Sequence, residues 1–216
     1  MASKHTLDLT TGSVTKKLLS FAFPILLSTI LQHLYTIADR VVVGNFAFDG
    51  PSALAAVGAT NSPTNLLLNL FTGISLGANI VCSNLRGAND QTRLRKCMHS
   101  ALVLSAVFGV VLMAVGLALA EKILTWMDTP ADVLPMAVTY MRIFFLGMPG
   151  SLVYNFGAAI LRSHGDSKRS MYILGVTGFI NVLLNLLLVM VFHLDVAGVA
   201  IASIIAQYVS IQPKAL

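Results

Sequence analysis

A carboxylate inside an apolar stretch is the first residue of this sequence that could do chemistry. Asp39 lies near the end of a hydrophobic run, and Thr36, Tyr35, Gln32 and Ser28 precede it by 3, 4, 7 and 11 positions. Because a helix turns once in about 3.6 residues, this spacing predicts that all five side chains share one helix face. A polar stripe that ends in a carboxylate indicates a face toward a water-filled cavity, where a proton or a small cation could bind.

Neighbouring positive charges leave a structural alternative open. Asp39 could instead pair with Arg40 or Arg142 near the outer face of the membrane. We favour the functional interpretation, because an intramembrane charge costs at least about 2.5–3.5 kcal/mol and usually marks a functional site. His33, beside the stripe, could carry a proton, but a lone histidine is more often a satisfied packing residue.

Three further apolar stretches carry amide or hydroxyl side chains four positions apart. These are Asn181 with Asn185, Ser203 with Gln207, and the series Asn61, Asn65 and Asn69. Each set taken alone is interpreted as a source of hydrogen bonds between helices, each of which stabilises helix association by about 1 kcal/mol or less. Since four stretches each present a polar stripe, the stripes together predict convergence on one cavity.

These stripes need membrane-spanning helices to position them, and the composition indicates a membrane protein. Of 216 residues, 56% are apolar and 11% charged, with a mean hydropathy of +0.80. Soluble domains carry about 25% charged residues. The net charge of +5 lies in short clusters between apolar runs, and not on a basic face with interleaved aromatics, so we expect no nucleic-acid partner. Sequence signatures of zinc proteases, P-loop proteins and serine hydrolases are absent, and no enzyme is predicted.

The expected fold is an all-α membrane protein built as a bundle of six transmembrane helices over residues 18–211. A span needs about 20 mostly apolar residues. The stretches that qualify are 18–43, 53–85, 98–120, 133–161, 171–192 and 197–211, between a cytoplasmic segment 1–17 and a short end 212–216. The second span is expected to start with an interfacial turn near Pro63, and Pro24 and Pro149 are expected to bend their helices. Gly73 and Gly77 form a GxxxG pattern that predicts close helix packing.

The basic residues predict the orientation in the membrane. Eleven Lys and Arg residues fall in the N-terminal segment, the second-to-third loop, the fourth-to-fifth loop and the C-terminal end, whereas only Lys122 falls on the other side. Since cytoplasmic loops are enriched in Lys and Arg, both termini are predicted to face the cytoplasm, with the chain in the plasma membrane and lipid around it. The two cysteines, Cys82 and Cys97, lack a CxxC spacing and are interpreted as small apolar residues, with neither a disulfide nor a metal site expected.

Several spaced segments resemble the multidrug and toxic compound extrusion (MATE) transporters. They are LTTGSV (9–14), KLLSFAFPIL (17–26), LYTIADRVVVG (34–44), ALAAVG (53–58), GISLGA (73–78) and GVAIAS (198–203). The resemblance runs along essentially the whole chain in the order of the family. It implies two pseudo-symmetric six-helix bundles around a central cavity, which export cationic or amphipathic drugs against H⁺ or Na⁺ by alternating access.

The resemblance also assigns roles to residues. Asp39 matches the first-helix carboxylate implicated in cation coupling, Asn181 and Asn185 match polar positions that complete that site, and Ser203 matches a small hydroxyl beside them. Many family members carry Asp where this chain has Asn185, so the coupling site has one carboxylate fewer. No cofactor beyond the coupling ion and no structural metal are expected. The remaining stripe residues are expected to line the cavity: Gln32, Tyr35, Thr36, Asn61, Asn65, Asn69 and Gln207.

The chain is only long enough for the N-terminal bundle of such a transporter. A separately encoded second half or a second copy of the chain is therefore an expected partner. Two alternatives stay open: a non-transporting truncated fragment or assembly module, and a lipid-linked flippase of the wider superfamily. A flippase cargo carries an anionic pyrophosphate, which predicts basic residues in the stripes. The polar and acidic stripes instead favour a cationic cargo.

Overall fold

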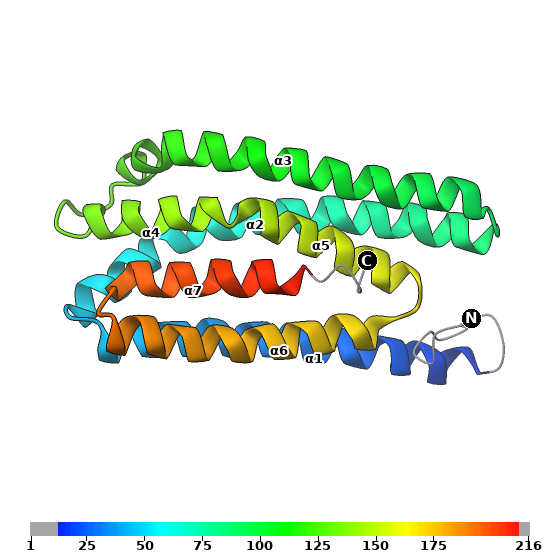
Figure 1. Cartoon of the computed structure of the whole chain (residues 1–216), viewed down its shortest axis with the longest axis horizontal. Coiled ribbons are helices and arrows are strands. Elements are labelled where there is room, and N and C mark those ends of the chain that lie inside the picture. The colour runs from blue at the N-terminus through cyan, green and yellow to red at the C-terminus, as the bar shows by residue number, and fades with distance from the viewer. Residues whose placement is uncertain (1–12, 212–216) are drawn as a thin grey trace.

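The computed structural model describes residues 13–211, and this part of the chain is helical without any strand (Figure 1). Residues 1–12 of the expected segment 1–17 and the expected end 212–216 lie outside the described residues. The elements are α1 (Val14–Phe46), α2 (Gly50–Gly87), α3 (Gln91–Trp126), α4 (Leu134–Leu146), α5 (Met148–Ser163), α6 (Ser167–Leu186), the π-helical η1 (Leu187–Val191) and α7 (Asp195–Ser210).

The predicted all-α membrane fold is confirmed, and a helix covers each expected span. Four helices of the described chain are long and apolar enough to cross a membrane, and α4 with α5 forms a fifth span bent by 49°. The last helix, α7, has only 16 residues, which is shorter than the roughly 20 residues of a usual span. The break between α4 and α5 falls at Gly147, and Pro149 occupies the first turn of α5, where a missing backbone N–H costs no helix hydrogen bond.

The expected interfacial turn at Pro63 is wrong. Helix α2 begins at Gly50, where Asp49 caps it by accepting a hydrogen bond from Ser52 N, and it continues through Pro63 without a break. Membrane helices tolerate an internal proline because neighbouring groups satisfy the backbone around it. The sequence suggested an interfacial turn at Pro63, but the acidic cap and the apolar run on both sides of Pro63 decide the helix length.

Successive membrane spans alternate in direction, so the loops gather at two ends of the bundle. The α2–α3 loop, the α5–α6 loop and the start of α1 lie at one end, whereas α7 stops short of that end (Figure 1). We call this the basic end, because it holds Lys16, Lys17, Arg86, Arg93, Arg95, Lys96, Arg162, Lys168 and Arg169.

Two loops at the basic end share one arrangement. Asp90 caps α3 and Asp166 caps α6, each accepting the backbone N–H of an arginine three positions later. The same arginines, Arg93 and Arg169, pair with these carboxylates at 3.3 and 3.2 Å. An aspartate at a helix start satisfies free N–H groups and complements the positive end of the helix dipole, so each of these loops begins a helix at a fixed residue.

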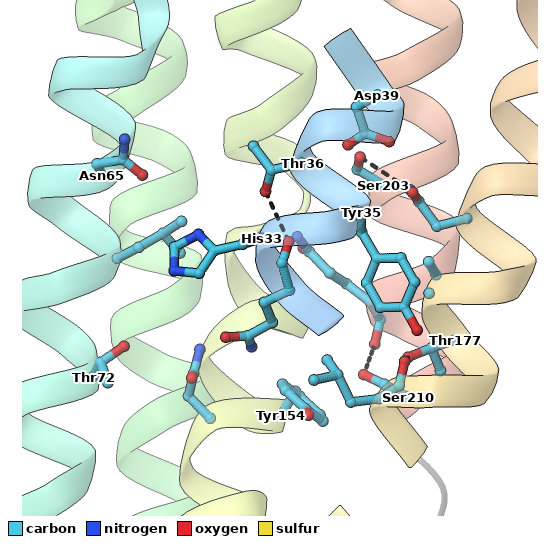
Figure 2. Close-up of a pocket in the computed structure, with 18 of the residues that line it drawn as sticks. His33, Tyr35, Thr36, Asp39, Asn65, Thr72, Tyr154, Thr177, Ser203 and Ser210 are labelled. Atoms are coloured by element: carbon cyan, nitrogen blue, oxygen red, sulfur yellow. Dashed lines mark hydrogen bonds between the residues drawn. The ribbon is translucent and has the colours of Figure 1, made fainter. Parts of the chain in front are cut away.

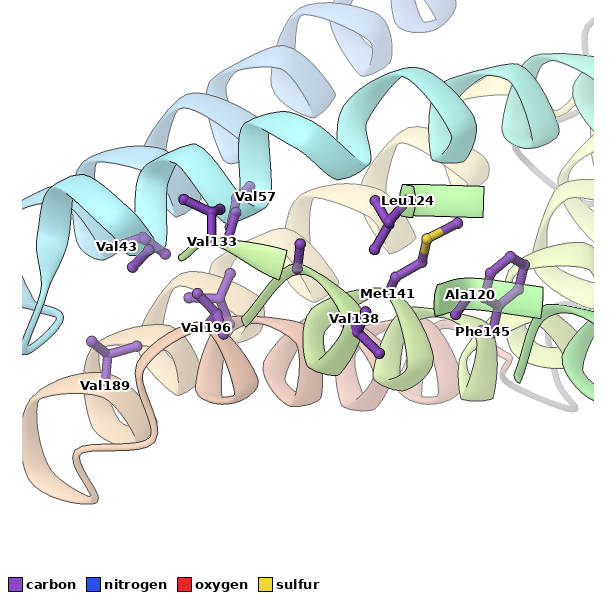
Figure 3. Packing of buried hydrophobic residues seen from close by; sticks show 14 of the residues in the cluster. Val43, Val57, Ala120, Leu124, Val133, Val138, Met141, Phe145, Val189 and Val196 are labelled. Carbon is purple, nitrogen blue, oxygen red and sulfur yellow. The ribbon is translucent and has the colours of Figure 1, made fainter. Parts of the chain in front are cut away.

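Apolar packing is concentrated at the end of the bundle opposite the basic end (Figure 3). There the end of α1, the start of α2, the end of α3, α4, η1 and the start of α7 meet around fully buried Met141 and Phe145. Gly116 lets α3 approach α4 closely, because a Cβ at Gly116 would overlap the ring of Phe145. The interior toward the middle of the bundle is left to polar side chains.

The GxxxG pattern of α2 does not serve packing within the described chain. A Cβ at Gly73 or Gly77 would have no neighbour within 4 Å. Glycine contacts that do bring helices together include Gly109 with Pro149, Gly116 with Phe145, and Gly178 with Tyr35. Sequence spacing identified a small-residue face, but the fold uses other glycines to let helices approach.

Candidate cation site and cavity

A cavity of about 600 Å³ lies among five helices in the middle of the bundle (Figure 2). Most of the residues that line it are polar: amides, hydroxyls, two tyrosines, one histidine, one arginine and one carboxylate among the described residues. The wall is formed by Gln32, His33, Tyr35, Thr36, Asp39 and Arg40 of α1; Asn65, Leu68, Asn69 and Thr72 of α2; Tyr154 and Asn155 of α5; Leu174, Thr177, Gly178 and Asn181 of α6; and Ser203, Ala206, Gln207 and Ser210 of α7.

Asp39 is held by amide groups from α6. The Nδ2 group of Asn185 donates a short hydrogen bond to Oδ1 of Asp39, across a sequence separation of 146 residues. Asn185 is fully buried and Asn181 is 6% exposed, so both amides contact the carboxylate from the interior of the bundle. A hydrogen bond to an ionised acceptor is stronger than one between neutral groups, and it fixes the carboxylate at this depth.

Asn181 connects the carboxylate to α7. The side-chain amide of Asn181 has the same shape in two orientations, which exchange the positions of its nitrogen and its oxygen. One of these orientations gives both atoms a hydrogen-bond partner. In that orientation the nitrogen of Asn181 donates to Oδ1 of Asp39 at 3.0 Å, and its oxygen accepts from Oγ of Ser203 at 3.2 Å. Three helices, α1, α6 and α7, therefore meet at Asp39 through side-chain hydrogen bonds.

One oxygen of this cluster lacks a donor. The Oδ1 atom of Asn185 is buried and has no hydrogen-bond partner among the described residues. An unsatisfied buried acceptor is costly, typically by about 1–3 kcal/mol. A carboxylate, a buried amide oxygen and a hydroxyl are oxygen donors of the kind that hard cations prefer. The described chain brings together no group of three or more His, Cys, Asp or Glu side chains.

The ion-pair alternative for Asp39 is not what the structure contains. Among the described residues, ion pairs join Arg93 to Asp90, Arg169 to Asp166, and Arg142 to Glu121, the last at 3.2 Å. Arg142 is thus engaged at the end opposite the basic end. Asp39 is bound by amides and not by a positive charge.

The predicted polar stripes converge on the cavity with three exceptions, which are Asn185, Asn61 and Ser28. Asn185 lies behind the wall, in contact with Asp39, and Asn61 lies one turn beyond the part of α2 that lines the cavity. The stripe residues that do line it are Gln32, Tyr35, Thr36, Asp39, Asn65, Asn69, Asn181, Ser203 and Gln207. Ser28 instead bonds the carbonyl of Pro24 at 2.7 Å within its own helix.

Several wall residues were not singled out from the sequence. Thr72 and Ser210 each continue a predicted stripe by three positions, and this spacing could have identified them. Tyr154 and Asn155 carried no periodic signal, since the break at Gly147 resets the helix face. His33 is exposed in the cavity wall and is not a packing residue, and Arg40 adds a positive charge beside Asp39 that the stripe did not predict.

Tyr35 closes the cavity toward α6. Its hydroxyl donates to the carbonyl of Gly175 at 3.1 Å, and its ring lies against Gly178, where a Cβ would overlap the ring. On the far side, Ser151 of α5 donates to Oε1 of Gln207 on α7. These contacts fix the helices around the site, so the cavity has a defined shape without a bound ligand.

Known proteins with the same arrangement identify the family. The MatE family profile matches residues 24–187. The chain is 33% identical over 198 residues to the probable multidrug resistance protein YoeA of Bacillus subtilis, covering 90% of this chain and 42% of that protein. It is 30% identical over 200 residues to the probable multidrug resistance protein YpnP of the same organism, covering 93% of this chain and 44% of that protein.

A solved structure agrees with these sequence matches. An outward-facing multidrug resistance MATE family transporter of the MOP superfamily superposes with a TM-score of 0.87 and 25% identity, over 97% of this chain and 46% of that one. The chain thus spans under half the length of the relatives it matches. The expected resemblance is confirmed: the chain belongs to the MatE family.

Proposed function

We propose that this chain forms the N-terminal half of a secondary transporter that exports cationic or amphipathic compounds in exchange for H⁺ or Na⁺. The observation that carries the proposal is Asp39, a carboxylate in the wall of a polar cavity, held by Asn185 and in reach of Asn181. An ionisable residue inside a membrane protein, facing a cavity, marks an ion or substrate pathway.

In this proposal the coupling ion and the cargo compete through Asp39. A proton or Na⁺ that binds Asp39 neutralises it and can use the free Oδ1 of Asn185 as a further oxygen ligand. A cationic cargo is attracted when Asp39 is charged and released when the coupling ion returns. Alternating access then requires a second bundle against which this one moves.

The second bundle is part of the proposal. Residues along α1 that face away from the other described helices are apolar and exposed, among them Leu19, Phe23, Leu26 and Ile30. The cavity wall contains polar groups that would be costly to leave against hydrocarbon. A different second half fits better than a second copy of the chain, because the relatives extend well beyond the part that this chain matches. We place the assembly in the plasma membrane, with the basic end in the cytoplasm.

A second candidate, transport of a lipid-linked anionic cargo, rests on a separate observation. Arg40 and His33 stand in the cavity wall together with Asp39. Basic wall residues are what an anionic headgroup needs. The single carboxylate and its buried amide partners favour the cation exporter, and the charge of the accepted cargo distinguishes the two candidates.

The decisive experiment uses a chimera in which this chain replaces the matching N-terminal part of YoeA. We expect gradient-driven export of a fluorescent cationic dye from membrane vesicles, and its loss in the Asp39→Asn variant. Asp132→Asn, which removes an exposed carboxylate far from the cavity, is the matched control and is expected to export normally. Equal amounts of inserted protein must be shown for all variants. Export by Asp39→Asn at the parental rate would exclude coupling through Asp39, and export of an anionic probe alone would favour the second candidate.

A further inference from the structure

The two cysteines of the chain lie side by side at the basic end of the α2–α3 hairpin. The Sγ atoms of Cys82 on α2 and Cys97 on α3 are 3.4 Å apart. Both are free thiols; Cys82 is fully buried, and Cys97 is partly exposed. The sequence, with 14 residues between them and no CxxC motif, gave no sign of this contact.

The surrounding structure holds the thiols in register. The hairpin turns within residues 88–90, and Asp90 fixes the start of α3 through the backbone N–H and side chain of Arg93. A disulfide bond is about 2.05 Å long, so the sulfurs need to approach by roughly 1.4 Å, within reach of side-chain rotation. Since the sequence contains two cysteines in all, no alternative intrachain pairing competes.

We propose that Cys82 and Cys97 are a redox modification site that closes to an intrachain disulfide when a hydroperoxide oxidises the pair. Cys97 reacts with the peroxide first, because its side chain is partly exposed whereas Cys82 is fully buried. Its thiolate attacks the peroxide oxygen, forming Cys97 sulfenic acid and releasing water or an alcohol. The thiol of Cys82 then attacks Sγ of Cys97 and expels water. The two thiols lose two hydrogens and two electrons, and the peroxide accepts them.

The disulfide would act on the cavity wall through α2. Thr72, the last α2 residue in the wall, lies ten residues before Cys82, which corresponds to about 15 Å along a helix. Closing the pair fastens the basic end of α2 to α3 and so restricts any movement of α2 relative to α3. An oxidant in the cytoplasm would thereby restrict α2, a helix of the cavity wall, without entering the cavity.

The test counts thiols and locates the bond in the purified chain. We expect two thiols per chain to react with a maleimide after denaturation, none after treatment with hydrogen peroxide, and two again after dithiothreitol. A tryptic digest of the oxidised chain should contain the peptides spanning residues 41–86 and 97–122 joined as one species, which separates on reduction.

Single variants provide the controls. Cys97→Ser should leave Cys82 unoxidised under the same peroxide dose, because the buried thiol alone is not reached. Cys82→Ala should instead stop at the sulfenic acid of Cys97, which a dimedone probe labels. Disulfide-linked dimers of the intact chain, or two thiols that persist through oxidation, would overturn the proposal. A Cys82→Ala chain that fails to insert leaves the thiol count and the peptide map of the unmutated chain to decide.

Discussion

At the level of single residues, the contact between Asp39 and Asn185 is the feature that sets the chemistry of the site. An amide donates to the carboxylate without neutralising it, so Asp39 keeps its capacity for a proton or a cation. The amide oxygen of Asn185 is left without a donor. Relatives in which position 185 is Asp would carry a second negative charge here, as the family resemblance implies.

Asn185→Asp is therefore expected to make the fold depend on a bound cation. Two carboxylates in contact repel each other unless a proton or Na⁺ lies between them. We expect the unfolding temperature of the variant in detergent to rise with added Na⁺, and to fall as the pH is raised from about 6 to about 8, more steeply than in the unmutated chain.

The control for this prediction adds the same charge elsewhere in the cavity. Asn65 lies on α2, apart from Asp39 in the cavity wall (Figure 2). Asn65→Asp should leave the Na⁺ and pH dependence unchanged. Equal dependence in both variants would mean that overall cavity charge, and not the pairing with Asp39, produces the effect.

At the level of elements, the junction of α1 with α6 decides the shape of the cavity. The ring of Tyr35 occupies the space in front of Gly178, and its hydroxyl reaches the carbonyl of Gly175. Since the ring fills this space, α1 is fixed against α6 at the level of the cation site. The π-helical η1 follows the end of α6, two residues after Asn185, in the kind of position where π-helical turns often accompany functional sites.

Gly178→Ala tests this junction, with Gly175→Ala as its matched partner three residues earlier on the same helix. A Cβ at position 178 would overlap Tyr35, whereas one at position 175 has no neighbour within 4 Å. We expect Gly178→Ala to destabilise the chain by about 1–3 kcal/mol through overpacking. Gly175→Ala should be neutral or slightly stabilising, because Ala favours a helix over Gly.

Thermal unfolding of both variants in the same detergent measures the difference. If Tyr35 adopts another rotamer at no cost, the two variants will unfold together, and the ring would not be the element that fixes α1. A combined Gly178→Ala and Tyr35→Ala chain should recover part of the lost stability relative to Gly178→Ala alone.

At the level of the whole molecule, the chain spans under half the length of the relatives that it matches, and our proposal gives it a second bundle as partner. The matched relatives extend over more than twice the matched length. We expect the 216-residue chain alone, reconstituted in liposomes with a pH or Na⁺ gradient, to take up no fluorescent cationic dye. Gradient-driven uptake that is lost in Asp39→Asn would show instead that copies of this chain form a working transporter.

The orientation of the bundle can be tested by accessibility of single cysteines. In a background without Cys82 and Cys97, an impermeant thiol reagent added outside cells should label a cysteine at exposed Asp132 and not one at exposed Lys168. The reason is the excess of Lys and Arg at the basic end, which favours the cytoplasmic side. The reverse labelling pattern would place the basic end outside.

The sequence alone determined the features that depend on local composition and periodicity. Long apolar runs predicted the helices, and the 3, 4 and 7 spacings predicted the polar face of α1 that lines the cavity. Both signals are local, because a helix fixes which of its own residues share a face. The same reasoning was wrong at Pro63, where a proline predicted an interfacial turn. The helix continues through this residue because the sequence on both sides of it is helical.

Tertiary structure decided everything that depends on which helix faces meet. Asn185 reaches Asp39 across 146 positions, and Cys82 reaches Cys97 across a hairpin, although neither pair has a motif in the sequence. Arg142 pairs with Glu121 and so leaves Asp39 to the amides. The close approach of helices at Gly109, Gly116 and Gly178 likewise depends on which faces meet. The spacing of residues along one helix contains no information on the partner that fills the space beside it.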